Sequence, residues 1–115
     1  MVDVTVQVSD DLAKRIQPIG DWLPTVLELS LVGFRTPATE TASDIIEFLA
    51  TDPAPEEVLD YYVSEEAQAR LQRLLALNQA GMLGPAEQLE LDELERIEHI
   101  MIMLKAKTAD CSAQT

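Results

Sequence analysis

Hydrophobic and polar residues alternate at the start of the chain. Val2, Val4, Val6 and Val8 are separated by polar side chains, which is the pattern of a β-strand with one buried face. A lone strand leaves its hydrogen-bonding edges unpaired. The pattern therefore predicts a strand that pairs with the same strand of a second copy, giving an intersubunit ribbon and a homodimer.

Beyond this strand the apolar positions follow helical spacing. Ser9 is placed to cap a short helix in which Leu12 and Ile16 share a face. Prolines and glycines mark the ends of the helices that follow. Three further helices are expected at 21–33, at 41–50 and from position 55 through the two tyrosines at 61–62.

The strongest helical pattern lies in the second half of the chain. Ser64 is expected to cap a helix that stops at Gly81, and Pro85 to open a long helix that reaches about Lys107. The apolar residues that recur at helical spacing are Ala67, Leu71, Leu74 and Leu75 in the first helix, and Leu94, Ile97, Met101 and Leu104 in the second. The pattern predicts an antiparallel helical hairpin.

The fold class expected is mainly α, with a short N-terminal strand followed by about six helices that end in the hairpin. A length of 115 residues suits a single domain. Its expected parts are 1–34 (strand and two helices), 35–63 (two short helices), 64–107 (hairpin) and 108–115 (tail).

Charge and composition narrow the functional classes. The net charge is -13 with 47% hydrophobic residues, which indicates a folded acidic protein rather than one that binds phosphate backbones. The single cysteine, Cys111, has no partner in the chain and favours the cytoplasm. No apolar run approaches the ~20 residues of a membrane helix. Neither a membrane nor nucleic acid is the expected partner.

The residues that carry chemistry do not form a catalytic or metal-binding pattern. A di-iron Glu-x-x-His motif ending at His99 would need a carboxylate where Arg96 stands, and a zinc helix would need a second histidine. The acidic run Glu90, Asp92, Glu93, Glu95 and Glu98 is expected to form a solvated helix face. The sequence therefore predicts no cofactor, no metal and no enzymatic activity.

The run of apolar residues from position 100 to position 104 covers every side of its helix. Its members are Ile100, Met101, Ile102, Met103 and Leu104, each about 100° from the next, which is more than one neighbouring helix can cover. One interpretation places the run in the core among the earlier helices. The other is a dimer or partner interface, to which the flexible methionines would adapt.

Two segments resemble parts of known families. The alternating strand, the Ser-Asp-Asp-Leu at 9–12 and the apolar helix before Gly33 resemble the ribbon-helix-helix domain of antitoxins and small repressors. Residues 64–107 carry Glu66-Ala67-Gln68-Ala69-Arg70-Leu71, Asn78, Gly81 and Glu90-Leu91-Asp92-Glu93-Leu94-Glu95. With these motifs they resemble the C-terminal hairpin of small antitoxin-like bacterial proteins.

The ribbon-helix-helix resemblance implies a DNA-reading role for the outward residues of the strand. These are Asp3, Thr5 and Gln7, with positive charge added nearby by Lys14 and Arg15. Residues 1–63 hold 12 acids and 3 bases (12 − 3, net -9), against 9 acids and 5 bases (9 − 5, net -4) in residues 64–115. We therefore expect the segment to keep dimerisation and to lose most DNA binding.

Taken together, these patterns predict a cytoplasmic, non-enzymatic, antitoxin-like binding protein. It would dimerise through its N-terminal strand and bind a partner through the hairpin, and a basic toxin or nuclease would complement its acidity. The alternatives are a self-assembling structural or adaptor protein without a toxin partner, and a weak DNA-binding autorepressor.

Overall fold

A computed structural model of the protein describes residues 2–113, with side chains described up to residue 110, so that Cys111 lies outside the described side chains. In chain order the elements are α1 (Asp10–Ile16), the 3-10 helix η1 (Gln17–Trp22), α2 (Leu23–Leu31), α3 (Ala38–Leu49), α4 (Pro55–Leu59), α5 (Glu65–Gln79) and α6 (Pro85–Ala113). The described part of the chain is thus mainly helical.

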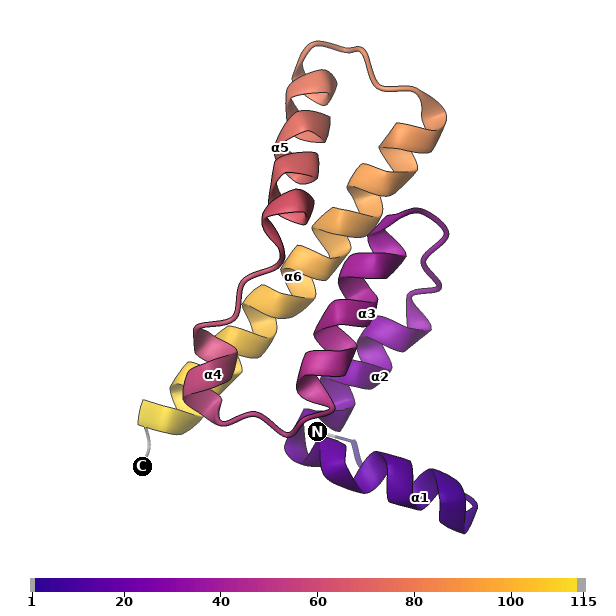
Figure 1. Ribbon diagram of the computed structural model, residues 1–115, viewed down its shortest axis with the longest axis vertical. Helices are drawn as coiled ribbons and strands as arrows, with labels where there is room; N and C mark the ends of the chain where they lie inside the picture. The colour runs from indigo at the N-terminus through magenta and orange to yellow at the C-terminus, as the bar shows by residue number, and fades with distance from the viewer. Residues whose placement is uncertain (1, 114–115) are drawn as a thin grey trace.

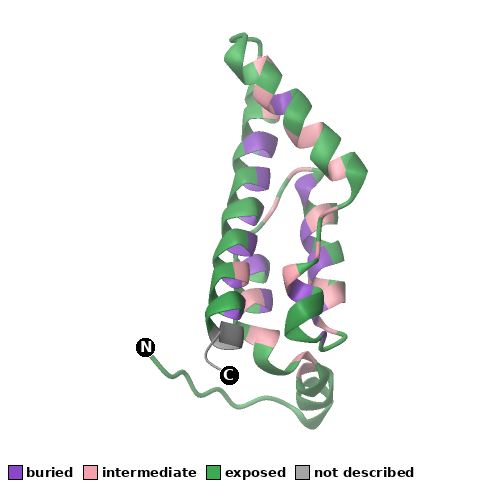
Figure 2. Ribbon diagram, turned by 90° about the vertical axis from the view of Figure 1, so that its left-hand side faces the viewer, coloured by how far each residue is buried: buried purple, intermediate pink, exposed green. Residues whose placement is uncertain are grey.

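The long helix α6 is the centre of the fold. As Figure 1 shows, α2 and α3 lie on one side of it, and α4 and α5 lie on the other. Helices α5 and α6 run in opposite directions and form a hairpin. The most deeply buried side chains of the fold come from the helices on both sides of α6 and from α6 itself: Leu29, Ile45, Leu49, Val58, Leu74 and Leu91. In Figure 2 the buried positions accordingly follow the inward faces of the helices.

Helix ends form where the sequence offers capping groups. The Ser9 hydroxyl accepts a hydrogen bond from the backbone N–H of Leu12 at 3.2 Å, and the Ser64 hydroxyl accepts one from Ala67 at 3.1 Å. Both predicted N-caps are therefore confirmed. After α5 the chain turns at Gly81, whose φ of 71° is favourable only without a side chain.

The predicted N-terminal β-strand is wrong. Residues 2–9 contain neither helix nor strand, and Val2, Val4, Val6 and Val8 are 86%, 80%, 72% and 40% exposed. The alternation of apolar and polar residues predicts which side chains of a strand would face inward. A strand also needs a neighbouring strand that pairs with its backbone N–H and C=O groups. No strand occurs in residues 2–113, so the intersubunit ribbon is not part of this fold.

Several helix boundaries also differ from the predicted ones; the helix expected at 21–33, for example, spans Leu23–Leu31. Helix α3 begins at Ala38, because the Thr36 hydroxyl accepts a hydrogen bond from the Ala38 N–H at 3.2 Å. Helix α4 ends at Leu59, so that the two tyrosines lie in the link to α5. Helix α6 continues past Lys107 to Ala113, and Thr108 is buried with its hydroxyl donating to the Leu104 carbonyl.

Two members of the predicted solvated acidic face are buried. Glu90 and Glu93 are 4% and 8% exposed, whereas Asp92, Glu95 and Glu98 are exposed. Each buried carboxylate has partners from a distant part of the chain, as buried charges require. Glu93 accepts hydrogen bonds from the N–H groups of Arg35 and Thr36 and from the Thr36 hydroxyl, at 2.7–3.2 Å. It thereby fixes the turn that precedes α3.

None of the helices in the described range combines the length and the apolar character needed to cross a membrane.

Candidate functional site

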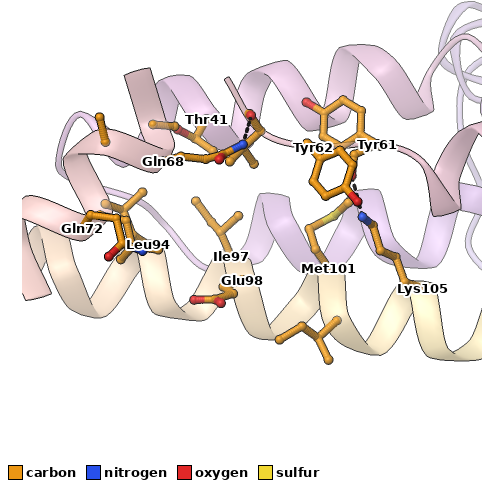
Figure 3. A pocket seen from close by; sticks show the side chains of 15 residues that line it. Thr41, Tyr61, Tyr62, Gln68, Gln72, Leu94, Ile97, Glu98, Met101 and Lys105 are labelled. Carbon is orange, nitrogen blue, oxygen red and sulfur yellow. Dashed lines mark hydrogen bonds between the residues drawn. The ribbon is translucent and has the colours of Figure 1, made fainter. Parts of the chain in front are cut away.

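A mainly apolar hollow in the described part of the chain lies along the hairpin. It is a half-open groove of about 460 Å³, between α6, α5 and the link that joins α4 to α5 (Figure 3). This volume falls in the range of ligand and side-chain pockets, roughly 300–1,000 Å³. We call it the hairpin groove. Its lining residues are Thr41, Tyr61, Tyr62, Val63, Ala67, Gln68, Ala69, Leu71, Gln72, Leu94, Ile97, Glu98, Met101, Ile102 and Lys105.

The floor of the hairpin groove is apolar and rigidly held. Leu94, Ile97 and Met101 recur at helical spacing on α6 and are 6%, 2% and 8% exposed. They belong to the core and also face the groove. The rim carries Tyr62 and Ile102, which are 75% and 57% exposed. A hollow with a fixed apolar floor and exposed apolar rim residues suits an apolar side chain of another molecule.

Lys105 lies at one end of the hairpin groove. Its ammonium group donates a hydrogen bond to the Tyr61 carbonyl and lies 4.6 Å from the centre of the Tyr62 ring (Figure 3), a cation–π arrangement. The Tyr61 ring stacks on Phe48 with 4.4 Å between ring centres. Burial, and secondarily the negative charge of Asp44, raises the pKa of Tyr61 above its ordinary value. These contacts hold the link against α6, through Lys105, and against α3, through Phe48.

An acidic hollow continues the groove at its other end. It is lined by Thr41, Ala67 and Leu94, which also line the groove, and lies near the first turn of α5. Its carboxylates belong to Glu40, Asp44, Glu65, Glu66 and Glu90, and its one cation is Arg70. Arg70 forms the single ion pair found among the described residues, with Glu90. The other four carboxylates are left facing solvent without a cation.

The Arg70–Glu90 pair is a two-point contact between α5 and α6. The guanidinium Nε and Nη2 donate to the two carboxylate oxygens at 2.7 and 3.0 Å. The bond to Glu90 raises the pKa of Arg70. The Glu90 side chain is 6% exposed and that of Arg70 is 41% exposed, so the carboxylate depends on the pair more than the guanidinium does.

Removal of Arg70 should therefore cost more stability than removal of the charge on Glu90. Arg70→Gln leaves a buried carboxylate without its cation, and we expect a loss of about 1–3 kcal/mol in the free energy of unfolding. Glu90→Gln leaves a guanidinium that water can solvate, and should cost roughly half as much. Urea denaturation of both variants measures the difference. Equal losses, or the reverse order, would contradict this account of the pair.

The apolar run at 100–104 is partly buried in the core and partly exposed to solvent. Ile100, Met101 and Leu104 are 6%, 8% and 7% exposed and pack in the core, because α6 has helices on two sides. Ile102 and Met103 remain 57% and 46% exposed. Only Met101 and Ile102 of the run line the hairpin groove.

The candidate residues of the N-terminal segment lie away from the groove. Thr5, Gln7, Lys14 and Arg15 are all exposed, the first two before α1 and the last two in its final turn. No residue of α1 is buried, and in Figure 1 this helix lies on the side of the molecule away from α5. The structure does not bring these residues together with Ile102 or Met103.

His99 is exposed on α6 and lines an open hollow with Arg96 and Glu28. Within the described residues, no group of three or more His, Cys, Asp or Glu side chains is placed to bind a metal ion.

Comparison with known proteins adds no relative. No protein-family model, curated protein or solved structure gives a significant match to the chain.

Sequence reasoning missed the polar end of the groove. Tyr62 and Lys105 come into contact only because the link after α4 lies against α6. Tyr61 and Lys105, which are joined by a hydrogen bond, are 44 residues apart in the sequence. The pattern around the tyrosines instead favoured a continuing helix. The apolar floor could be found, since Leu94, Ile97 and Met101 follow helical spacing.

Proposed function

We propose that this protein is a non-enzymatic, antitoxin-like binding module whose helical hairpin binds a basic partner protein. The observation that carries the proposal is the continuity of the apolar hairpin groove with the acidic hollow, through Thr41, Ala67 and Leu94. A partner that places an apolar side chain in the groove would bring its neighbouring cations over four solvent-facing carboxylates.

An amphipathic helix is the partner element that best suits this surface. Helices bind grooves through apolar residues spaced three or four apart, with polar residues on the flanks. The net charge of -13 would attract a basic protein from a distance and speed association. A basic toxin or nuclease in the same cytoplasm is the class of partner with this chemistry.

Ile102→Lys should weaken partner binding by about tenfold or more, because it places a cation at the rim of the groove that a basic partner must approach. The measurement is co-purification of the tagged chain from its native host, with the recovered partner identified and quantified. We expect a basic protein with the wild-type chain and little of it with the variant.

Met103→Lys is the matched control. It adds the same charge to the neighbouring exposed residue, which does not line the groove, and should retain partner within about threefold of the wild type. A chain that is repeatedly recovered alone, or equal loss of the partner in both variants, would contradict the proposal.

A self-assembling structural or adaptor protein is the second candidate. The observation that favours it is the row of exposed valines at 2, 4 and 6, with Leu31 83% exposed on α2, since exposed apolar surface often marks association. Size-exclusion chromatography with light scattering separates the two functions. A mass well above that of a dimer would favour the assembly, and a monomer or dimer would remove it.

A further inference from the structure

Helix α1 packs against the adjoining η1 and makes no extensive contact with another helix of its own chain. None of its residues is fully buried. Figure 2 shows α1 and the segment before it beyond the end of the helical body and mostly exposed. Leu12, 43% exposed, and the half-buried Ile16 lie one turn apart on α1. An amphipathic helix with a partly uncovered apolar face is the element that a helix-binding groove accepts.

The charges of α1 mirror those of the hairpin groove. Its first turn carries Asp10 and Asp11, and its last turn carries Lys14 and Arg15. The groove has Lys105 at one end and the acidic hollow, with Glu65 and Glu66, at the other. A helix laid with its C-terminal turn over the acidic hollow would meet opposite charge at both ends.

The lengths are also compatible. From Leu94 to Lys105 the groove follows α6 over 11 residues, or roughly 16 Å at 1.5 Å per residue. The seven residues of α1 span roughly 10 Å. The remaining distance at each end is within reach of Lys, Arg and Asp side chains.

The α1 of the same chain is not placed to fill this groove. It lies on the side of the molecule away from α5 in Figure 1. The segment that follows it is fixed, since the Trp22 indole N–H donates to the Pro53 carbonyl at 3.0 Å and Ile19 packs against the core. The helix that fits must come from a second molecule.

We infer that two copies of this chain associate by placing α1 of each copy in the hairpin groove of the other. Leu12 and Ile16 face the apolar floor, and Arg15, on the flank of that face, lies over the acidic hollow, while Lys14, on the opposite face, adds positive charge at the same end of α1. Two identical contacts close the dimer, as expected for twofold symmetry. The inference rests on the proposed function in one respect, namely that the groove is a helix-binding site. It adds that the partner and α1 compete for that site.

Charge reversal on either side of the contact tests the inference. Lys14→Glu/Arg15→Glu places acid against the acidic hollow, and Glu65→Lys/Glu66→Lys places base against the basic turn of α1. Each variant alone should dimerise about tenfold or more weakly than the wild type in sedimentation equilibrium. Mixed in equal amounts, the two should form a heterodimer, because both contacts then join opposite charges.

Two controls separate docking from folding. Glu56→Lys/Glu57→Lys makes the same change in the first turn of α4, which lines neither the groove nor the acidic hollow, and it should dimerise as the wild type does. Leu12→Ser removes an exposed apolar anchor without a charge change and should weaken the dimer. Circular dichroism confirms wild-type helix content in each variant.

The outcomes also separate this inference from the proposed function. A wild-type chain that stays monomeric up to about 1 mM, or folded variants that fail to associate on mixing, would overturn the α1 exchange. Equal weakening by the control pair would do the same. None of these results would contradict the co-purification of a basic partner, which tests the proposed function separately. If the exchange holds, Lys14→Glu/Arg15→Glu should recover at least as much partner as the wild type, since its groove is free.

Discussion

Leu74→Ala should lower the free energy of unfolding by about 3–4 kcal/mol. Leu74 is fully buried and is the one residue of α5 buried against the rest of the fold in the described structure. Truncation removes its apolar contacts and leaves a cavity between α5 and α6, which the surrounding helices can close only in part. Urea denaturation followed by circular dichroism measures the loss.

Leu77→Ala is the matched control on the same helix. Leu77 is only half-buried and does not pack against the core cluster, so the same chemical change should cost roughly 1 kcal/mol or less. Because α5 forms a wall of the hairpin groove, the Leu74 variant should also bind the partner more weakly. Equal losses of stability in the two variants would show that α5 does not dock as described.

Glu93→Ala should lower the free energy of unfolding by about 2–4 kcal/mol. The carboxylate accepts hydrogen bonds from the backbone N–H groups of Arg35 and Thr36 and from the Thr36 hydroxyl. Truncation leaves these partly buried donors without an acceptor, and an unsatisfied donor costs more than its bond contributes. Thermal or urea unfolding measures the effect.

Two further variants test the cause of that loss. Glu93→Gln retains an acceptor oxygen and should lose less stability than Glu93→Ala. Glu95→Ala removes an exposed carboxylate two positions away on the same helix and should stay within about 0.5 kcal/mol of the wild type. A neutral Glu93→Ala would show that this carboxylate does not hold the turn before α3.

Local signals predicted the helices well. The hydroxyls of Ser9 and Ser64 cap α1 and α5, and the turn at Gly81 follows α5. These signals act within a few residues, so they are visible in the sequence. The alternating valines are a local signal too, yet a strand is completed only by a neighbour that the described chain does not supply.

The partners of the buried acids could not be predicted, because they are distant in the sequence. Arg70 is 20 residues from Glu90, and Arg35 is 58 residues from Glu93. On α6 Glu90 lies seven residues and Glu93 four residues before the buried Ile97, so both share its helix face, whereas Glu95 does not. The spacing does not show the groups of α5 and of the turn before α3 that pair with these carboxylates.

The candidate site was predictable in part for the same reason. The helical spacing of Leu94, Ile97 and Met101 identifies an apolar face on α6. Whether that face is wholly covered depends on where α4 ends and where the following link lies, and neither is encoded in a short pattern. The composition shows that the protein is acidic but not where the acidic residues lie. In the structure the carboxylates of Glu40, Asp44, Glu65 and Glu66 lie together beside the groove.

Methyl NMR of the protein, labelled at isoleucine and methionine and titrated with the co-purified partner, tests the binding site most directly. Ile97, Met101 and Ile102 line the hairpin groove, whereas Met82 and Met103 are exposed elsewhere. We predict that the partner shifts the signals of the first three residues and leaves those of Met82 and Met103 nearly unchanged. Shifts at Met82 or Met103 with an unperturbed groove would contradict the account.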